Sequence, residues 1–196
     1  MEDRLNKQIQ FLIEVDKMKT ILRQTLLVDK SRRENDAEHS WHFALMAMVL
    51  HEHADQTKVN LSRVIKMALV HDLIEIYAGD TFAYDEAGNE SRNEREQAAA
   101  NRLFGLLPSD QSGEIRGLWE EFETMETPDA CYAAAIDRLQ PLINNYMTEG
   151  HTWKLGNVKS DKVYKRMAVI EAAAPELWLF VANLIETSIE KGYLQR

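Results

Sequence analysis

The chain has 196 residues, of which 45% are hydrophobic and 28% are charged, a balance typical of a soluble globular protein. Acidic residues (32) outnumber basic ones (23), which gives a formal net charge of −9. This charge argues against a nucleic acid polymer as partner, because proteins that bind phosphate backbones normally carry a basic surface. Small anions are still compatible with it, since a few clustered arginines can bind a phosphate. The length suits one domain, so we expect residues 1–196 to form a single domain.

Cysteine content and hydropathy bear on the compartment. Cys131 is the only cysteine, so no intrachain disulfide is possible, as is typical of a reducing environment. The first residues have neither the apolar core nor the cleavage pattern of a signal peptide, and no apolar run approaches the length of a membrane span. We therefore expect a cytoplasmic protein with no membrane partner.

Hydrophobic residues recur at helical spacing along most of the chain, and no segment alternates with the period of two typical of a strand. Capping residues and prolines mark several helix starts. The predicted helices cover 4–26, 37–53, 60–79, 94–107, a segment from 109 onward, 127–149, a segment from 160 onward and 175–192. Loops are predicted over 28–36, 81–93 and 151–158. The expected fold class is all-α.

The third predicted helix carries charged residues within an apolar run. Its residues Val64, Ala68 and Leu69 recur on the side that faces a core, and His71, Asp72 and Glu75 follow in the same stretch. Burying an unpaired carboxylate is costly. A metal ion, a cationic side chain or access to water must therefore offset that cost, and we look for chemistry here.

Two other polar residues lie in apolar surroundings. His39 falls on the apolar stripe of the second predicted helix, and Asp137 follows the small and apolar residues 133–136. Taken alone, a buried histidine is more often a hydrogen-bonded core residue than a metal ligand. Asp137 alone could equally form an ion pair with Arg138 or Lys154. Two histidines on consecutive helices with a short connection, however, favour an arrangement in which they meet.

Together, His39, His71, Asp72 and Asp137 make a set of two imidazoles and two carboxylates from three predicted helices. Such ligands suit Mn²⁺, Fe²⁺, Co²⁺, Ni²⁺ or Zn²⁺ and do not single out one metal. A bound metal can lower the pKa of a coordinated water and polarise a phosphoryl oxygen. Glu75, which this set leaves over, is placed to orient or deprotonate that water.

The ordered pattern His39, His71-Asp72 and Asp137 resembles that of the HD-domain metal-dependent phosphohydrolases. The flanking sequences narrow the resemblance to the small HD-type 5′-nucleotidases that act on deoxynucleoside monophosphates. These flanks are Glu38-His39-Ser40, His71-Asp72-Leu73-Ile74-Glu75 and Gly79-Asp80.

The resemblance implies an all-helical fold, usually a homodimer. It implies one divalent metal ion (Mn²⁺, Co²⁺, Fe²⁺, Ni²⁺, Zn²⁺ or Mg²⁺), and catalytic acid–base or water-positioning roles for Glu75 and Asp80. The implied metal ligands are His39, His71, Asp72 and Asp137.

Relatives in this family use an arginine near the end of the first helix for the phosphate, followed by a tryptophan that excludes the ribose 2′-hydroxyl. Arg23 matches the arginine, whereas Gln24 stands in place of the tryptophan. The resemblance therefore does not extend to selection of deoxyribose. The basic run 30–33 is either a solvated charge run or the source of a second phosphate ligand, for which Arg33 is our candidate.

The leading hypothesis is a metal-dependent phosphohydrolase that removes phosphate from (deoxy)nucleoside 5′-monophosphates by attack of a metal-bound water. One alternative is a triphosphohydrolase or phosphodiesterase of the same superfamily. The short chain and the single predicted metal argue against the dinuclear phosphodiesterases. Another alternative is a non-catalytic module that senses a metal or a nucleotide, although a structural site would need neither Glu75 nor Asp80.

Overall fold

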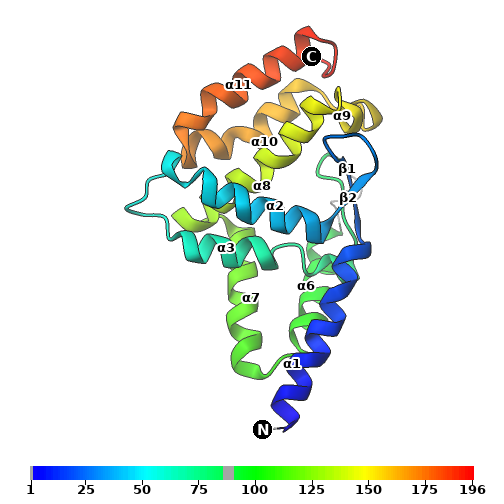
Figure 1. Ribbon diagram of the computed structural model, residues 1–196, viewed down its shortest axis with the longest axis vertical. Helices are drawn as coiled ribbons and strands as arrows, with labels where there is room; N and C mark the ends of the chain where they lie inside the picture. The colour runs from blue at the N-terminus through cyan, green and yellow to red at the C-terminus, as the bar shows by residue number, and fades with distance from the viewer. Residues whose placement is uncertain (1, 86–90) are drawn as a thin grey trace.

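Amphipathic segments produce helices along most of the chain, as Figure 1 shows for the computed structural model, which describes residues 2–85 and 91–196. The all-α fold class is confirmed. In chain order the elements are α1 (Glu2–Val15), β1 (Leu22–Leu26), β2 (Arg33–Asn35), α2 (Asp36–Val49), α3 (Leu61–Val70), α4 (Glu75–Ala78), α6 (Arg92–Phe104), α7 (Ser109–Thr124), α8 (Pro128–Met147), α9 (His151–Leu155), α10 (Ser160–Ala173) and α11 (Pro175–Glu190). Short 3₁₀ turns lie at Asp16–Thr20 and His51–His53.

The core is built around α8, which contacts α2, α3, α7 and α10. Small residues on this helix, Ala133, Ala134 and Ala135, are buried and let the neighbouring helices approach closely. Tyr132 is fully buried as well, and its hydroxyl donates to the carbonyl of Ala47 on α2 at 3.0 Å. Figure 1 shows the consequence: α10 and α11 lie above α8, and α2 and α3 lie below it.

The helix predicted over 4–26 is wrong beyond Val15. The chain leaves α1 through a 3₁₀ turn and enters β1, which pairs antiparallel with β2 inside the segment predicted as a loop. The backbone N–H of Asp36 also donates to the carbonyl of Ile21 at 3.1 Å. These hydrogen bonds join residues that are distant in sequence, so helical periodicity within 16–26 could not reveal them.

Other helix boundaries also differ from the prediction. α2 ends at Val49, four residues early, and the third predicted helix breaks after Val70 into a turn and the short α4. The loop predicted over 151–158 contains α9. Of the loop predicted over 81–93, residues 86–90 lie outside the described residues, and α6 begins at Arg92. The later helices begin within two residues of their predicted starts.

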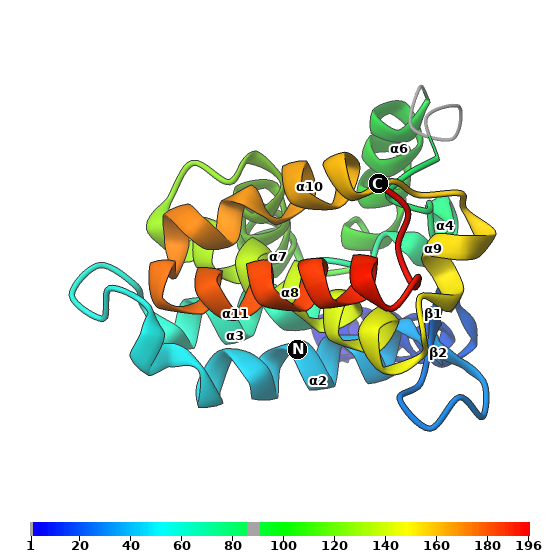
Figure 2. The ribbon, with the colours of Figure 1, turned by 90° about the horizontal axis from the view of Figure 1, so that it is seen from above.

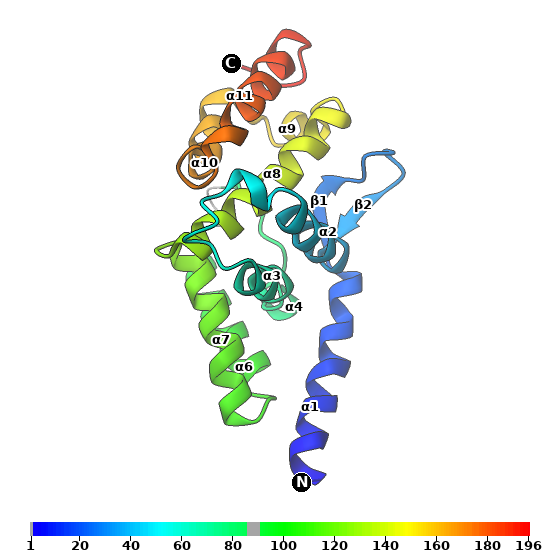
Figure 3. The same ribbon diagram turned by 60° about the vertical axis from the view of Figure 1, so that its left-hand side comes forward.

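Away from the core, α1 and the antiparallel pair α6 and α7 extend in the same direction, toward the N-terminus of the chain (Figures 1 and 3). Their far ends are joined by side chains. The guanidinium of Arg4 forms two hydrogen bonds of 2.8 Å with the carboxylate of Asp110, and Gln8 donates to Gln111 at 2.7 Å. Within the described residues, no helix is both long and apolar enough to cross a membrane.

Two glycines provide a matched test of the backbone. Gly150, between α8 and α9, has a φ of +72°, and a Cβ built there would lie 2.0 Å from the carbonyl oxygen of Tyr193. We expect Gly150→Ala to lower the free energy of unfolding by about 1–3 kcal/mol. Gly113→Ala, on α7 where a Cβ meets no atom within 4 Å, should raise it by about 0.5–1 kcal/mol. Urea denaturation measures both changes, and equal stability of the two variants would contradict the expectation.

Candidate metal centre

β1, α2, the turn after α3 and α8 bring polar side chains together in the buried interior. His39 comes from the first turns of α2, His71 and Asp72 from the turn after α3, and Asp137 from the middle of α8. Arg23 reaches the same place from β1. The structure thus brings together all four predicted metal ligands and the predicted phosphate-binding arginine.

The capping of α2 sets the position of His39. Asn35 accepts a hydrogen bond from the backbone N–H of Glu38, and the side chain of Glu38 accepts one from the backbone N–H of Asn35. This reciprocal capping box fixes where the helix begins. His39 follows directly and is fully buried.

The imidazole of His39 is oriented by α8. Its Nδ1 lies 3.2 Å from Oε1 of Gln140, and the amide nitrogen of Gln140 donates to Glu34 at 2.7 Å. With the Gln140 oxygen facing the ring, Nδ1 carries the proton, so Nε2 of the neutral ring presents a lone pair. That nitrogen lies 2.9 Å from Oδ1 of Asp137 and 3.9 Å from Oδ2 of Asp72.

His71 is arranged in the same way. Nδ1 lies 3.0 Å from the carbonyl of Ala68, to which it donates. Nε2 therefore faces Oδ2 of Asp72 at 3.0 Å and Oδ1 of Asp137 at 3.5 Å, and it is buried with no hydrogen-bond partner among the described atoms. The two imidazole rings lie with their centroids 5.3 Å apart.

The break after Val70 places the carboxylates. From Leu73 to Tyr77 the backbone hydrogen bonds join residues three apart, as in a 3₁₀ turn, rather than four. In such a turn, side chains three residues apart lie above one another, so Asp72 and Glu75 share a side. The sequence predicted a continuous helix here. The structure has a tighter turn instead, in which Glu75 lies on the same side as Asp72.

Burial and mutual charge shift the acidity of these groups. Burial raises the pKa of Glu75 well above its usual range, and the charges of Asp72 and Asp36 raise it further. Burial likewise raises the pKa of Asp36 to about 7, with a further contribution from Asp72. Burial also raises the pKa of Asp72, but the opposite charges of His71 and Arg23 outweigh it and lower that pKa.

The pKa values of the two histidines shift in opposite directions. Burial and the charge of Arg23 lower the pKa of His39, so that ring is neutral. Burial also lowers the pKa of His71, but the carboxylates of Asp72 and Asp137 outweigh it and raise the pKa to about 10. The space between His71, Asp72 and Asp137 therefore favours a positive charge.

These donors fit a divalent metal ion. The Nε2 atoms of His39 and His71 and a carboxylate oxygen of Asp72 lie within 4.8 Å of one another, which one ion can bridge. Each histidine donates its other ring N–H to a fixed oxygen, the arrangement usual for metal-binding histidines. Asp137 faces both Nε2 atoms and completes the set.

A cavity opens beside this cluster, at the end of the molecule where β1, α4 and α9 gather (Figure 2). One wall comes from α8, whose Asp137, Pro141 and Asn145 repeat at intervals of four residues. Leu142 of α8 also lines the cavity, and the remaining lining residues belong to β1, the segment after α3, α6, α7, α9 and α10: Arg23, Gln24, Thr25, His71, Asp72, Glu75, Asp80, Thr81, Phe82, Ala83, Tyr84, Arg92, Phe122, Glu123, Thr152, Trp153, Arg166 and Met167.

The remaining predicted site residues separate into two groups. Glu75 and Asp80 line the cavity, and each has one buried carboxylate oxygen without a hydrogen-bond partner among the described atoms. Arg33 does not line the cavity, because its guanidinium donates to the backbone carbonyls of Arg23 and Leu22 across the β1–β2 pair. Burial raises the pKa of Asp80, which lines the cavity, and the charge of Arg33 partly offsets that rise. The role of Arg33 as a second phosphate ligand therefore stays a prediction. Its neighbour Arg32 binds Glu38 instead.

Several residues near the site were not predicted from the sequence. Glu34 and Asp36 are buried beside Arg23, each with an oxygen 3.9 Å from its guanidinium. Arg92 and Arg166 add positive charge to the cavity wall. The burial of Glu34 and Asp36 depends on the β1–β2 pairing, and nothing in the local sequence distinguishes Arg92 or Arg166 from other surface arginines.

Comparisons with known proteins agree with this geometry. The model of the HD domain family matches residues 15–178. The chain belongs to the HD domain family. The resemblance seen in the motifs is thereby confirmed.

Among solved structures, a predicted metal-dependent phosphohydrolase from Magnetospirillum magnetotacticum MS-1 is 53% identical, with a TM-score of 0.95 over 100% of this chain and 97% of its own. An HD-domain phosphohydrolase from Listeria innocua shares the fold, with a TM-score of 0.65 at 17% identity and 94% coverage of both chains.

The curated relatives are less similar in sequence than the Magnetospirillum magnetotacticum protein. The human 5′-deoxynucleotidase HDDC2 is 31% identical over 136 residues, which is 69% of this chain and 65% of the human protein. The Danio rerio protein of the same name is 29% identical over 79% of this chain and 76% of its own length. The chain thus spans slightly less than two thirds of the human relative.

Gln140 offers a test of the metal centre that does not depend on turnover. Gln140→Ala leaves Nδ1 of His39 and the carboxylate of Glu34 without their shared partner, so the ring is no longer held. We expect the affinity for Mn²⁺, measured by isothermal titration calorimetry, to fall roughly 10–100-fold. Gln111→Ala at the far end of α7 serves as control and should bind Mn²⁺ like the wild type. Unchanged affinity in Gln140→Ala would show that His39 needs no support from α8.

Proposed function

We propose that this protein is a metal-dependent phosphohydrolase that releases phosphate from nucleoside 5′-monophosphates. The observation that carries the proposal is a pair of buried histidines that meet the carboxylates of Asp72 and Asp137 beside a cavity lined by further carboxylates and arginines. The family membership and the names of the curated relatives support the same activity.

The metal would be held by His39, His71, Asp72 and Asp137, with Mn²⁺, Co²⁺, Fe²⁺, Ni²⁺, Zn²⁺ and Mg²⁺ as candidates. When bound, it supplies Lewis-acid polarisation of a phosphoryl oxygen and lowers the pKa of water. The Nδ1 contacts of both histidines keep their Nε2 atoms directed at this position.

Arg23 is the candidate phosphate ligand. Its guanidinium is largely buried, donates to Asp72 at 2.6 Å, and has its Nε without a hydrogen-bond partner among the described atoms. The neighbouring carboxylates keep its pKa raised despite burial, so it stays charged. Arg92, on the opposite wall, is held by Glu96 and Glu123. Both cations can balance the charge of a phosphate in the cavity.

Glu75 and Asp80 are the candidate acid–base residues. Each has an oxygen free of protein hydrogen bonds among the described residues. Glu75 would take the proton of the attacking water, and Asp80 would position water or protonate the leaving oxygen.

Purified protein supplied with Mn²⁺ or Co²⁺ should release phosphate from nucleoside 5′-monophosphates and should not release triphosphate from nucleoside triphosphates. Glu75→Gln should reduce kcat by roughly 10²–10⁴-fold while Mn²⁺ remains bound. Phosphate and chromatographic product assays measure the first result, and metal analysis of the purified variant measures the second. If metal-loaded protein cleaves no phosphate ester in a broad panel, the proposed function is wrong.

Aromatic side chains in the cavity lining suit a nucleoside. Phe82, Tyr84 and Trp153 line the cavity and can pack against a base or sugar. Gln24 follows Arg23 on β1 and also lines the cavity. It stands where the family resemblance puts a tryptophan that excludes the 2′-hydroxyl.

Because a glutamine leaves that side polar and less filled, we expect kcat/KM for ribo- and deoxyribonucleotides with the same base to agree within about tenfold. Gln24→Trp should lower kcat/KM for the ribonucleotide by more than about tenfold and leave the deoxyribonucleotide within about threefold, consistent with the cost of a poor fit at one contact. Paired kinetic assays test this. A wild-type protein that already rejects ribonucleotides would contradict the role given to Gln24.

We further propose a homodimer of single-domain subunits in the cytoplasm. Trp41, Leu45 and Met48 form an exposed apolar stripe on α2, with exposed fractions of 64%, 41% and 54%. Such a stripe is typical of a surface that packs on another protein.

Light scattering should therefore give the mass of a dimer for the wild type, and Trp41→Glu/Leu45→Glu should shift it toward the monomer. Leu179→Glu, at an exposed position on α11, is the control and should leave the mass unchanged. A monomeric wild type would contradict the proposed dimer.

A further inference from the structure

A second pocket adjoins the cavity of the metal centre and is rich in positive charge. Its lining residues are Ala83, Tyr84, Arg138, Lys162, Lys165 and Arg166. Four of these six side chains are basic, and none is acidic, although the chain as a whole carries a net charge of −9. We call these four residues the basic pocket.

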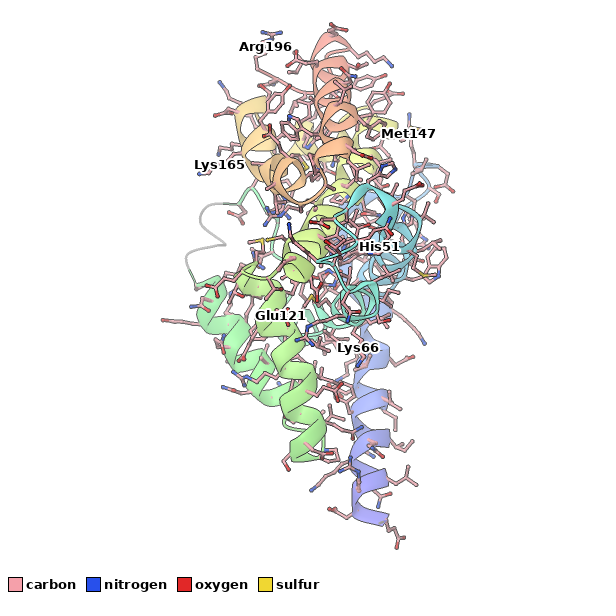
Figure 4. All side chains as sticks on the ribbon, turned by 90° about the vertical axis from the view of Figure 1, so that its left-hand side faces the viewer. His51, Lys66, Glu121, Met147, Lys165 and Arg196 are labelled. Carbon is pink, nitrogen blue, oxygen red and sulfur yellow. The ribbon has the colours of Figure 1, made fainter. Side chains whose placement is uncertain are left out.

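Helix geometry gathers these cations. Lys162, Lys165 and Arg166 occupy positions i, i+3 and i+4 of α10 and therefore share one side of that helix. Arg138 comes from α8, and its Nη1 donates to the backbone carbonyl of Arg166 at 3.1 Å. Lys165 projects outward from α10, as Figure 4 shows.

Three of the four cations in this pocket, Arg138, Lys165 and Arg166, lack a carboxylate partner among the described residues. The other donor nitrogen of Arg138 points at the sulfur of Met125, 3.0 Å away. Over residues 2–85 and 91–196, no ion pair joins Arg138, Lys165 or Arg166 to a carboxylate, whereas Arg63 and Arg116 both have glutamate partners. Guanidinium groups and an ammonium gathered in this way favour an anion among them, and phosphate matches guanidinium geometry.

The basic pocket and the cavity of the metal centre share a wall. Ala83, Tyr84 and Arg166 line both. Tyr84 is held there by a hydrogen bond with the side chain of Trp153, which also lines the cavity. A ligand that has one end at the metal centre and passes Tyr84 therefore arrives at the basic pocket.

We propose that the basic pocket binds a phosphate group, and that a nucleotide with phosphates at both ends spans it and the metal centre. A nucleoside 3′,5′-bisphosphate has this chemistry. The choice of a nucleotide as the carrier rests on the proposed function, whereas binding of phosphate in the pocket does not. The same pocket chemistry would also accept a separate phosphate or pyrophosphate ion.

Binding measured without turnover tests the proposal. Glu75→Gln protein with Mn²⁺ is titrated calorimetrically with a nucleoside 5′-monophosphate, with the 3′,5′-bisphosphate of the same nucleoside, and with pyrophosphate. The same titrations are made with Lys162→Ala/Lys165→Ala added, two exposed positions away from the metal centre. The charge-matched control is Lys7→Ala/Lys19→Ala, on and just after α1.

We expect the bisphosphate to bind at least tenfold tighter than the monophosphate, and this advantage to be lost in Lys162→Ala/Lys165→Ala but kept in the control. The monophosphate should bind all three proteins alike. If pyrophosphate binding alone depends on the two lysines, the pocket binds a separate phosphate ion, and the spanning ligand is overturned. If neither ligand depends on them, the basic pocket is overturned, and this result leaves phosphate release from monophosphates by the wild type unaffected.

Discussion

The arrangement of this molecule depends on an excess of buried negative charge. Asp72 and Asp137 meet the Nε2 atoms of two histidines in the interior. Glu34 and Asp36 are buried around them and Glu75 is half-buried, with Arg23 as the main counter-charge. Leaving such carboxylates unpaired would cost several kcal/mol each. A divalent cation between the imidazoles and carboxylates removes that cost, and the other features of the site follow from the need to hold it.

Each element near the site contributes to this electrostatic arrangement. The β1–β2 pair carries Arg23 into the interior, α8 supplies both Asp137 and the Gln140 that orients His39, and the tight turn after Val70 puts Asp72 and Glu75 on one side. The large buried side chains around α8 hold these elements at fixed separations. Because the ligands come from segments about 100 residues apart, the site forms only when the whole core does.

The sequence revealed the chemistry of this centre better than its surroundings. His71, Asp72 and Asp137 could be predicted because each is a polar residue within an apolar helical segment, where burial without a partner would be costly. The β1–β2 pair was missed because its hydrogen bonds join residues 22–26 to 33–35, a relation without a local periodicity. For the same reason the position of Arg33 on the sheet, and of Arg92 and Arg166 in the cavity wall, was not predicted.

The central claim, that one buried cluster holds a divalent metal ion, is tested most directly by anomalous scattering from crystals grown with Mn²⁺. The account predicts an anomalous peak within coordination distance of Nε2 of His39, Nε2 of His71 and carboxylate oxygens of Asp72 and Asp137. The peak should disappear in Asp137→Asn crystals that keep the fold. An anomalous peak elsewhere, with the cluster bearing none in protein that binds Mn²⁺ in solution, would contradict it.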